Sequence, residues 1–127
     1  MEENELGLHN IAKTFNKKIE ITKAKIFDGS LRSGNKIEYE GTIIVTGDVN
    51  AGAEVVAGEN VIVVGALRGL AHAGAKGNKR AIIVSGSIDA AQVRIADIVK
   101  EIEIYDEDEE DTIKKKAYIE NDVIIME

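Results

Sequence analysis

Charged and polar side chains that could form a recognition site recur along the middle of the sequence. Asp48 and Asn50 lie in one repeat of a short pattern, with Arg32 in the preceding repeat and Arg68 in the following one. A carboxylate between two guanidinium groups can hold both through charge-assisted hydrogen bonds. Such a group is either an ordinary surface ion network, in which each pair contributes about 0 to 1 kcal/mol, or a patch that binds a partner. The spacing alone favours the ion network.

The composition of the chain excludes several other kinds of chemistry. Its 127 residues suffice for one domain that needs no disulfide or metal for stability. The absence of cysteine removes thiolate zinc sites and cysteine nucleophiles and fits a reducing cytoplasm. The net charge of −7 and the 4% aromatic content disfavour nucleic acid as a partner. No apolar run could span a bilayer and the acidic N-terminus is unlike a signal peptide, so we expect a cytoplasmic protein without a cofactor.

An internal repeat predicts the elements that position these residues. Segments that begin at Lys25, Ile43, Val61 and Ile82 align on a shared glycine, with offsets of 18, 18 and 21 residues. An apolar residue recurs about every six positions and is expected to face a common core: Leu31, Ile37, Ile43, Val49, Val55, Val61, Leu67, Ala73, Ile82 and Ile88. Three sides of six residues make one coil. Residues 25–99 are therefore predicted to form an all-β, three-sided β-helix of about four 18-residue coils.

Strand alternation predicts which residues of each side are buried, because residues i and i+2 point the same way. The expected inward pairs are Ile43 with Val45, Val49 with Ala51, and Val55 with Ala57. The expected corners are at Gly29, Gly47, Gly65 and Gly86. In the last coil the pattern would bury Arg94, so a shift of one residue that buries Val93 and Ile95 is favoured.

The flanking segments are predicted to cover the open ends of the solenoid, whose unpaired strand edges must be capped. Residues 5–18 carry apolar side chains at helical spacing, with glutamates before them and lysines at their end. We therefore expect residues 1–24 to be a cap segment with a short N-terminal helix. Residues 98–105 and 117–126 alternate like strands. The charged segment between them, with its acidic run 106–111, is expected to be a solvated loop.

Two sides of the predicted β-helix differ in their outward residues. One side carries an apolar ladder of Ile26, Ile44, Ile62 and Ile83, with Val64 beside it. Coils about 4.8 Å apart would join these side chains into a surface that a monomer rarely exposes, so we expect a two-fold homodimer interface. The alternative is that a flanking segment such as residues 98–125 covers the ladder. The next side, which we call the polar side, carries Ser30, Arg32, Asp48, Asn50, Ala66, Arg68, Ser87 and Asp89.

Two other classes of β-helical protein are alternatives. Hexapeptide acyltransferases, which are left-handed β-helices, use a histidine as a general base, and His72 is the candidate within the repeat. Their repeats prefer a small or acidic residue after the aliphatic one, where this chain has Arg32, Ile44, Asn50, Val56, Ile62 and Arg68. Polymer-forming bactofilins are small β-helices with short tails, and the apolar ladder could stack protomers into filaments. The enzyme is disfavoured, and the polymer is the stronger alternative.

Several segments of the sequence resemble one known family. LRSGNKIEYEG, VTGDVNAGAEVVAGENVIVVGALRGLAHAGAKGN and QVRIADIV are similar, in this order, to the C-terminal domain of the bacterial septum-site-determining protein MinC. The resemblance runs from about Leu31 to Val99 and implies a right-handed β-helix. It divides the chain into a cap segment, residues 1–24, and a MinC-like domain, residues 25–127.

The resemblance also implies a function. It indicates a cytoplasmic, non-enzymatic division regulator that dimerises, is recruited to the membrane by the ATPase MinD, and antagonises assembly of the tubulin-like protein FtsZ. It assigns MinD binding to the motif Arg32, Ser33, Gly34 and Asn35 and to Asp48, with Asn50 beside it, and contact with the FtsZ tail to Arg68. The outward members of these motifs fall on the polar side, which makes partner binding the favoured interpretation of that side.

The sequence departs from the family in two respects. Asn35 stands where the family usually has glutamine, whose side chain is one methylene longer. A complete family member also has an N-terminal α/β domain that carries much of the FtsZ inhibition, and residues 1–24 are too few to form it. Either the chain is an excised or divergent short member of the family, or the inhibitory activity is absent. Because the chain begins with methionine and a predicted capping helix, we expect a natural short form.

Overall fold

The computed structural model describes residues 23–103 and 113–127, in which every regular element is a β-strand. The strands are β1 (Ala24–Phe27), β2 (Lys36–Tyr39), β3 (Thr42–Val45), β4 (Glu54–Ala57), β5 (Val61–Leu67), β6 (Leu70–Ala73), β7 (Ile83–Ile88), β8 (Gln92–Ile95), β9 (Ile98–Glu101), β10 (Lys116–Glu120) and β11 (Val123–Met126). The predicted N-terminal helix and the acidic run 106–111 lie outside the described residues.

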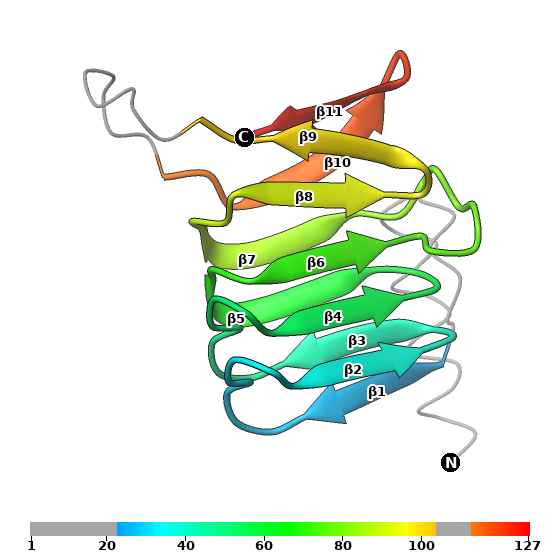
Figure 1. Ribbon diagram of the computed structural model, residues 1–127. Helices are drawn as coiled ribbons and strands as arrows, with labels where there is room; N and C mark the ends of the chain where they lie inside the picture. The colour runs from blue at the N-terminus through cyan, green and yellow to red at the C-terminus, as the bar shows by residue number, and fades with distance from the viewer. Residues whose placement is uncertain (1–22, 104–112) are drawn as a thin grey trace, which may run out of the picture.

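Successive strands from β1 to β8 alternate between two sheets, as expected for a coiled chain (Figure 1). Sheet A has the order β1-β3-β5-β7-β10-β11, and sheet B has the order β2-β4-β6-β8-β9. The strands from β1 to β8 pair in parallel within their sheets. A third side is marked by parallel bridges that join Leu31 to Val49 and Val49 to Leu67. The predicted three-sided, all-β solenoid is therefore confirmed.

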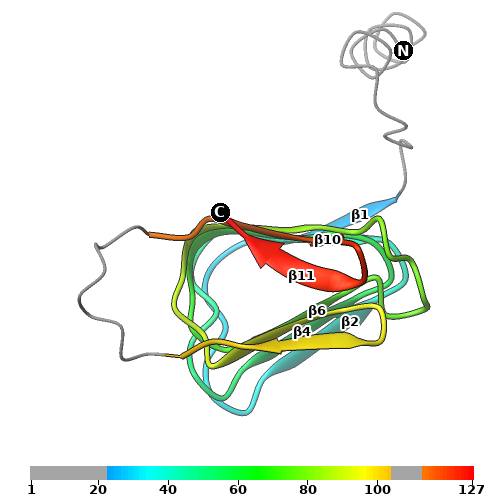
Figure 2. The same cartoon turned by 90° about the horizontal axis from the view of Figure 1, so that it is seen from above.

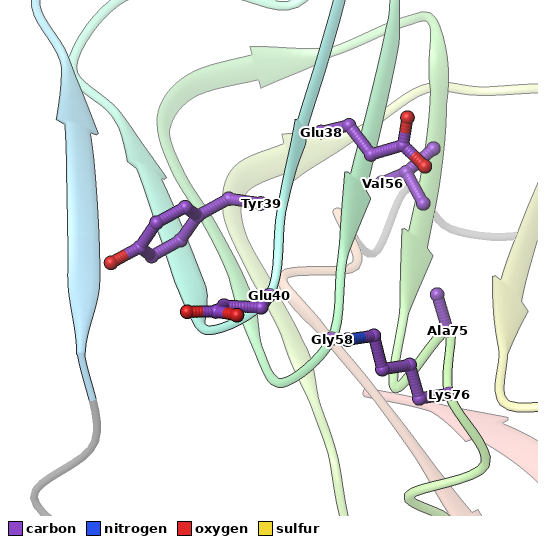
Figure 3. A pocket seen from close by; sticks show the side chains of 7 residues that line it. All are labelled: Glu38, Tyr39, Glu40, Val56, Gly58, Ala75 and Lys76. Carbon is purple, nitrogen blue, oxygen red and sulfur yellow. The ribbon is translucent and has the colours of Figure 1, made fainter.

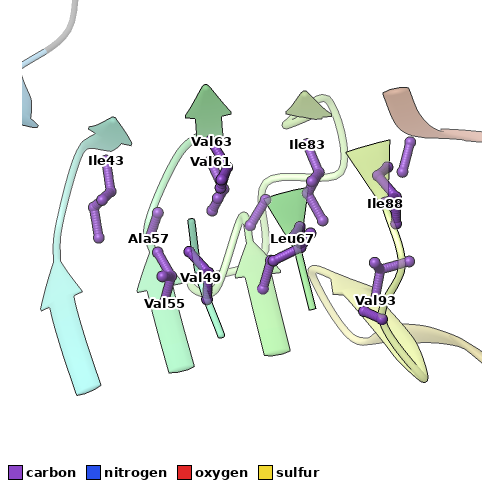
Figure 4. Packing of buried hydrophobic residues seen from close by; sticks show 14 of the residues in the cluster. Ile43, Val49, Val55, Ala57, Val61, Val63, Leu67, Ile83, Ile88 and Val93 are labelled. Atoms are coloured by element: carbon purple, nitrogen blue, oxygen red, sulfur yellow. The ribbon is translucent and has the colours of Figure 1, made fainter. Parts of the chain in front are cut away.

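The core is a continuous stack of inward side chains from the three sides (Figure 4). Val45, Val49, Val55, Val61 and Leu67 have no exposed surface. Burying each such side chain contributes about 1.5 to 3 kcal/mol. The predicted shift in the last coil is confirmed, because Val93 and Ile95 are fully buried.

The coils are less uniform than the predicted repeat, and two inward assignments are wrong. Val61 pairs with Ile83 instead of Ile82, since the turn after β6 is longer than the sequence alignment allowed. Ile83 is fully buried, whereas Ile82 lies outside the core. Ala51 is exposed at the tip of a turn, and Ala53 takes the inward position instead.

The two ends of the solenoid differ. At the C-terminal end, β9 extends sheet B, and the β10–β11 hairpin extends sheet A and runs across the opening (Figure 2). Ala117 and Ile124 of this hairpin are buried against the core. At the N-terminal end, Phe27, Ile37 and Tyr39 pack on the core but are only half-buried. In the described part of the chain, no helix has the length and apolar character needed to cross a bilayer.

Candidate functional site

The polar side is the outer face of the third side of the solenoid, and backbone pairing along that side positions its residues. Leu31, Val49 and Leu67 point inward and carry the bridges between coils. The residues next to these three in the chain therefore point outward, at equivalent positions in successive coils. Asn50 N–H donates to Leu31 O at 3.0 Å, and Arg68 N–H donates to Val49 O at 2.7 Å. Backbone hydrogen bonds between neighbouring coils thus hold the polar side chains in place.

Asp48 connects three coils. Its N–H donates to Ser30 Oγ at 2.9 Å, and its Oδ1 accepts the N–H of Ala66 at 2.8 Å. Its Oδ2 lies 3.8 Å from Arg68 Nη1, and both side chains of this ion pair remain more than 40% exposed. An ion pair so open to solvent contributes at most about 1 kcal/mol. One carboxylate oxygen therefore bonds to the backbone of the next coil, and the other takes part in the exposed ion pair.

Asn50 lies two residues after Asp48 on the same coil, and its side chain makes one hydrogen bond to the backbone and one to another side chain. Its Nδ2 donates to Leu31 O at 2.9 Å, and its Oδ1 accepts from Arg68 Nη1 at 3.3 Å. The Arg68 guanidinium is therefore held by Asp48 and Asn50 together. One coil further on, Ser87 Oγ donates to Asp89 Oδ2 at 3.2 Å, so the side stays polar.

The motif from Arg32 to Asn35 forms a tight turn at the corner between the polar side and sheet B. Asn35 N–H donates to Arg32 O at 2.9 Å, and Gly34 has a φ of 92°, as a type II turn requires. Asn35 Oδ1 accepts the N–H of Arg32 at 3.0 Å, which closes the turn from the other side. The amide oxygen of Asn35 thus stabilises the turn.

A second turn of the same kind stacks on the first. Ala53 N–H donates to Asn50 O at 2.9 Å, and Gly52 has a φ of 88°. Gly34 N–H donates to Gly52 O at 3.0 Å and joins the two turns. The structure therefore brings the predicted residues Arg32, Ser33, Gly34, Asn35, Asp48, Asn50 and Arg68 together on one continuous exposed surface.

One predicted contact within this surface is wrong. Asp48 pairs with Arg68 but not with Arg32, and among the described residues the Arg32 guanidinium is in no ion pair. The stacking of the coils places Asp48 over Ser30, and the turn that begins at Arg32 leads its side chain into solvent. Arg32 is therefore a cation presented to solvent.

The apolar ladder on the outer face of sheet A consists of Ile26, Ile44, Ile62 and Val84, which are paired in this order. The prediction for Ile83 is wrong, because Ile83 faces the core. Val84 was missed because the sequence alignment set the last repeat at an offset of 21 residues, whereas the pairing of Val61 with Ile83 requires 22. Ile26 and Val64 are 64% and 61% exposed. Among the described residues, β10 and β11 continue sheet A edge to edge beyond β7, so they do not cover this face.

His72 lies on the outer face of sheet B, away from the polar side. Its Nε2 is 2.8 Å from Ala96 O, where it donates to the β8–β9 turn. A nitrogen that donates to a carbonyl cannot at the same time accept a proton from a substrate. In residues 23–103 and 113–127, no group of three His, Asp or Glu side chains could hold a metal.

An open depression of about 470 Å³ lies at the edge of the same face, between β2 and the turn after β6 (Figure 3). Its lining residues are Glu38, Tyr39, Glu40, Val56, Gly58, Ala75 and Lys76. His72 is not among them. His72, the one histidine among the described residues, therefore could not act on a substrate through this depression.

The fold and the site define an all-β solenoid of the β-helix class, with a polar side and a separate apolar outer face. The chain belongs to the family of the septum formation inhibitor MinC through the C-terminal domain, whose family model matches residues 25–127.

Relatives of this family cover most of the chain. A probable septum site-determining protein MinC from Persephonella marina is 44% identical over 103 residues, which are 81% of this chain and 51% of that protein. One from Acetivibrio thermocellus is 38% identical over 107 residues, which are 81% of this chain and 45% of that protein. The chain thus spans about half the length of these curated relatives.

A solved structure gives the same result for the fold. A chain in the MinC:MinD cell division protein complex of Aquifex aeolicus superposes with a TM-score of 0.76 at 36% sequence identity. The match covers 84% of this chain and 86% of that chain. The fold of most of this chain is therefore found in a chain of that complex.

Proposed function

We propose that this chain is a non-enzymatic cell-division regulator that binds a MinD-type ATPase through its polar side. The observation that carries the proposal is the continuity of the site. The turn Arg32–Asn35 stacks on the turn Asn50–Ala53 through the hydrogen bond from Gly34 N to Gly52 O. The similarity to a chain of the MinC:MinD complex supports the choice of partner. The right-handed winding and the β-helix domain at residues 25–127 belong to the same proposal.

The proposed MinD site consists of Arg32, Ser33, Gly34, Asn35, Asp48 and Asn50. Arg32 offers an exposed guanidinium in no ion pair with a described residue, so a partner carboxylate would not have to displace an existing one. Asp48 offers the oxygen of its exposed ion pair with Arg68, while its other oxygen accepts the N–H of Ala66 and keeps the coil in register. The turn backbone is fixed before binding, which lowers the entropy lost on association.

Arg68 is proposed to contact the tail of FtsZ. Asp48 and Asn50 hold its guanidinium, and the side chain remains 48% exposed. The guanidinium is therefore both fixed in orientation and accessible to a partner. An acidic tail segment would bring carboxylates that match the guanidinium. Since the MinD site includes Asp48, the two sites would share one edge, and binding of one partner would affect the other.

Dimerisation is proposed to use the apolar ladder Ile26, Ile44, Ile62 and Val84, with Val64 beside it. The side chains form a row along the outer face of sheet A, which suits a self-complementary two-fold contact. A dimer would present two polar sides to a dimeric ATPase. The chain would be cytoplasmic and reach the membrane only through that partner.

Co-sedimentation with a MinD-type ATPase on phospholipid vesicles tests the proposal. With ATP the chain should pellet with the vesicles, and with ADP it should stay in the supernatant. Arg32→Ala and Asp48→Asn should each reduce recruitment, whereas Glu38→Ala on the outer face of sheet B is the control and should bind normally. Failure of the wild-type chain to pellet would refute the function. Normal recruitment of both site variants would refute the site.

A polymer-forming scaffold of the bactofilin kind is the second candidate. The observation that favours it is the uncovered edge of β1 and β2 at the N-terminal end of the described residues. Electron microscopy of the purified chain separates the two candidates. Filaments without any ATPase would favour the scaffold, and compact particles of dimer size would favour the regulator.

An acyltransferase that uses His72 is the third alternative from the sequence. The hydrogen bond from His72 Nε2 to Ala96 O gives this side chain a structural role. Turnover of acetyl-CoA by the purified chain that is lost in His72→Ala would establish the enzyme and overturn the proposal of a non-enzymatic regulator.

A further inference from the structure

The strand β9 ends sheet B by reversing the direction of the chain. β4, β6 and β8 each pair in parallel with the strand one coil earlier, whereas β9 pairs with β8 in an antiparallel arrangement. Ile95 pairs with Ile98, so Ala96 and Asp97 alone connect the two strands. β9 thereby occupies the edge of β8 on which a further parallel coil would lie, and it caps this sheet at the C-terminal end (Figure 1).

The turn between β8 and β9 has an unfavourable residue at its centre. Ala96 has a φ of 56°, and it is the only one of the two turn residues with a positive φ, as in a type II′ turn. The first central position of such a turn favours glycine, because a Cβ there crowds the backbone. The β10–β11 turn, in contrast, has its positive φ values at Asn121 and Asp122, residue types that tolerate this conformation. Ala96 therefore has a strained backbone.

Two hydrogen bonds from β6 hold Ala96 in this conformation. Its N–H donates to Ala73 O at 2.9 Å, and its carbonyl oxygen accepts from His72 Nε2 at 2.8 Å. The first bond repeats the one from Gly58 N–H to Tyr39 O in an earlier coil, so the contact with His72 is the special feature of this turn. Backbone strain persists only where the surrounding structure enforces it. His72 is thus a candidate latch for the turn.

His72 can make this contact with a neutral or a charged ring. Nε2 carries a proton in the imidazolium and in one of the two neutral tautomers, and a carbonyl oxygen only accepts. The side chain is half-buried on the outer face of sheet B, between Val56 and Arg94, which pair with it on the neighbouring strands. The ring is therefore held beside the turn by its neighbours.

β9 is otherwise held less firmly than the inner strands. Among the described strands, β8 alone pairs with it, and Val99 at its centre is 45% exposed. On its inner side, Ile98 packs on the core and is only half-buried. Beyond its far end, Ile102 N–H donates to Ala91 O at 2.8 Å. A strand with one paired edge and few buried side chains belongs to the part of a fold that opens locally.

We propose that β9 is a hinged cap, which turns about Ala96 and Asp97 and is latched closed by His72. In the closed state β9 pairs with β8 and covers the last coil of sheet B. In the open state the turn loses its strain, and the backbone groups of Val93 and Ile95 become an exposed strand edge. The latch therefore controls whether this end of sheet B can accept a further strand.

Amide hydrogen exchange of the full chain, followed by NMR, tests the cap. Ala96 N–H is directed at β6, so by strand alternation the amides within the β8–β9 pairing are those of Val93, Ile95, Ile98 and Lys100. These four, the cap amides, should have similar protection factors, above those of an unstructured peptide and below those of β5. Protection equal to that of β5, or no protection, would overturn the proposal.

A substitution of His72 tests the latch. His72→Phe keeps an aromatic ring but has no donor, so the cap amides should exchange about tenfold faster while the amides of β5 keep their rates. Val56→Ala changes the residue paired with His72 one coil earlier and is the control, which should leave the cap amides unchanged. Unchanged exchange in His72→Phe, or an equal acceleration of β5, would overturn the latch.

A substitution of Ala96 tests the hinge in the opposite direction. Glycine adopts a positive φ without strain, so Ala96→Gly should slow the exchange of the cap amides about threefold. Asn121→Gly makes the same kind of change in the β10–β11 turn and is the matched control, which should leave the cap amides unchanged. Cap amides that exchange at the wild-type rate or faster in Ala96→Gly would show that the turn stores no strain and would overturn the hinge.

Discussion

Asp48 and Arg68 lie on adjacent coils of the polar side, with Oδ2 of the carboxylate 3.8 Å from Nη1 of the guanidinium. The other carboxylate oxygen accepts the N–H of Ala66 at 2.8 Å. One side chain therefore has two roles that can be separated by mutation. The backbone hydrogen bond keeps two coils in register, and the ion pair orients a cation at the surface.

Asp48→Asn and Asp48→Ala should differ in stability. Asparagine keeps an acceptor for Ala66 N–H and loses only an exposed ion pair, so the free energy of unfolding should fall by less than about 1 kcal/mol. Alanine leaves the N–H without its partner, which should cost about 1 kcal/mol more. Urea unfolding of both variants checks this. Equal stability of the two variants would show that the hydrogen bond contributes nothing.

The paired glycines of the two stacked turns should also differ. Gly34 and Gly52 both have positive φ values, but a Cβ on Gly34 would meet nothing within 4 Å, whereas one on Gly52 would collide with Ser33. Gly34→Ala should therefore cost about 1 kcal/mol from backbone strain alone, and Gly52→Ala should cost more. Ala51→Ser at the exposed tip of the same turn is the control and should be neutral. A smaller loss for Gly52→Ala than for Gly34→Ala in urea unfolding would contradict the geometry.

Neighbouring positions on β7 should separate folding from dimerisation. Val84→Asp places a charge on the outer face of sheet A and should give folded monomers, because a dimer would have to desolvate two carboxylates. Ile44→Asp and Ile62→Asp should do the same. Ile83→Asp buries its charge in the core and should prevent folding. Light scattering and circular dichroism check both results; a dimer of Val84→Asp would move the interface to another face.

Most of this fold could be predicted from the sequence because inward residues recur at a fixed period. Val49 and Val55 follow that period and are buried as predicted. The register of β7 could not be predicted, since the loop before it has its own length and conformation, and an error of one residue exchanged Ile83 and Val84. The side of the candidate site was predictable from spacing. Its internal contacts, such as Arg68 with Asn50, depend on turn geometry that no spacing encodes.

Substitutions of Asn35 should show whether this side chain serves the turn, the partner or both. Its Oδ1 accepts the N–H of Arg32 at 3.0 Å. Asn35→Asp keeps that oxygen and should retain stability, whereas Asn35→Ala loses it and should cost about 1 kcal/mol. Asn35→Gln carries the family's usual residue on a longer side chain, so it should lose part of the turn stability and still support recruitment to vesicles. Urea unfolding measures the first effect and co-sedimentation with the ATPase measures the second. If Asn35→Asp is fully recruited, the amide nitrogen has no part in partner binding, and the role of Asn35 is confined to closing the turn that presents Arg32.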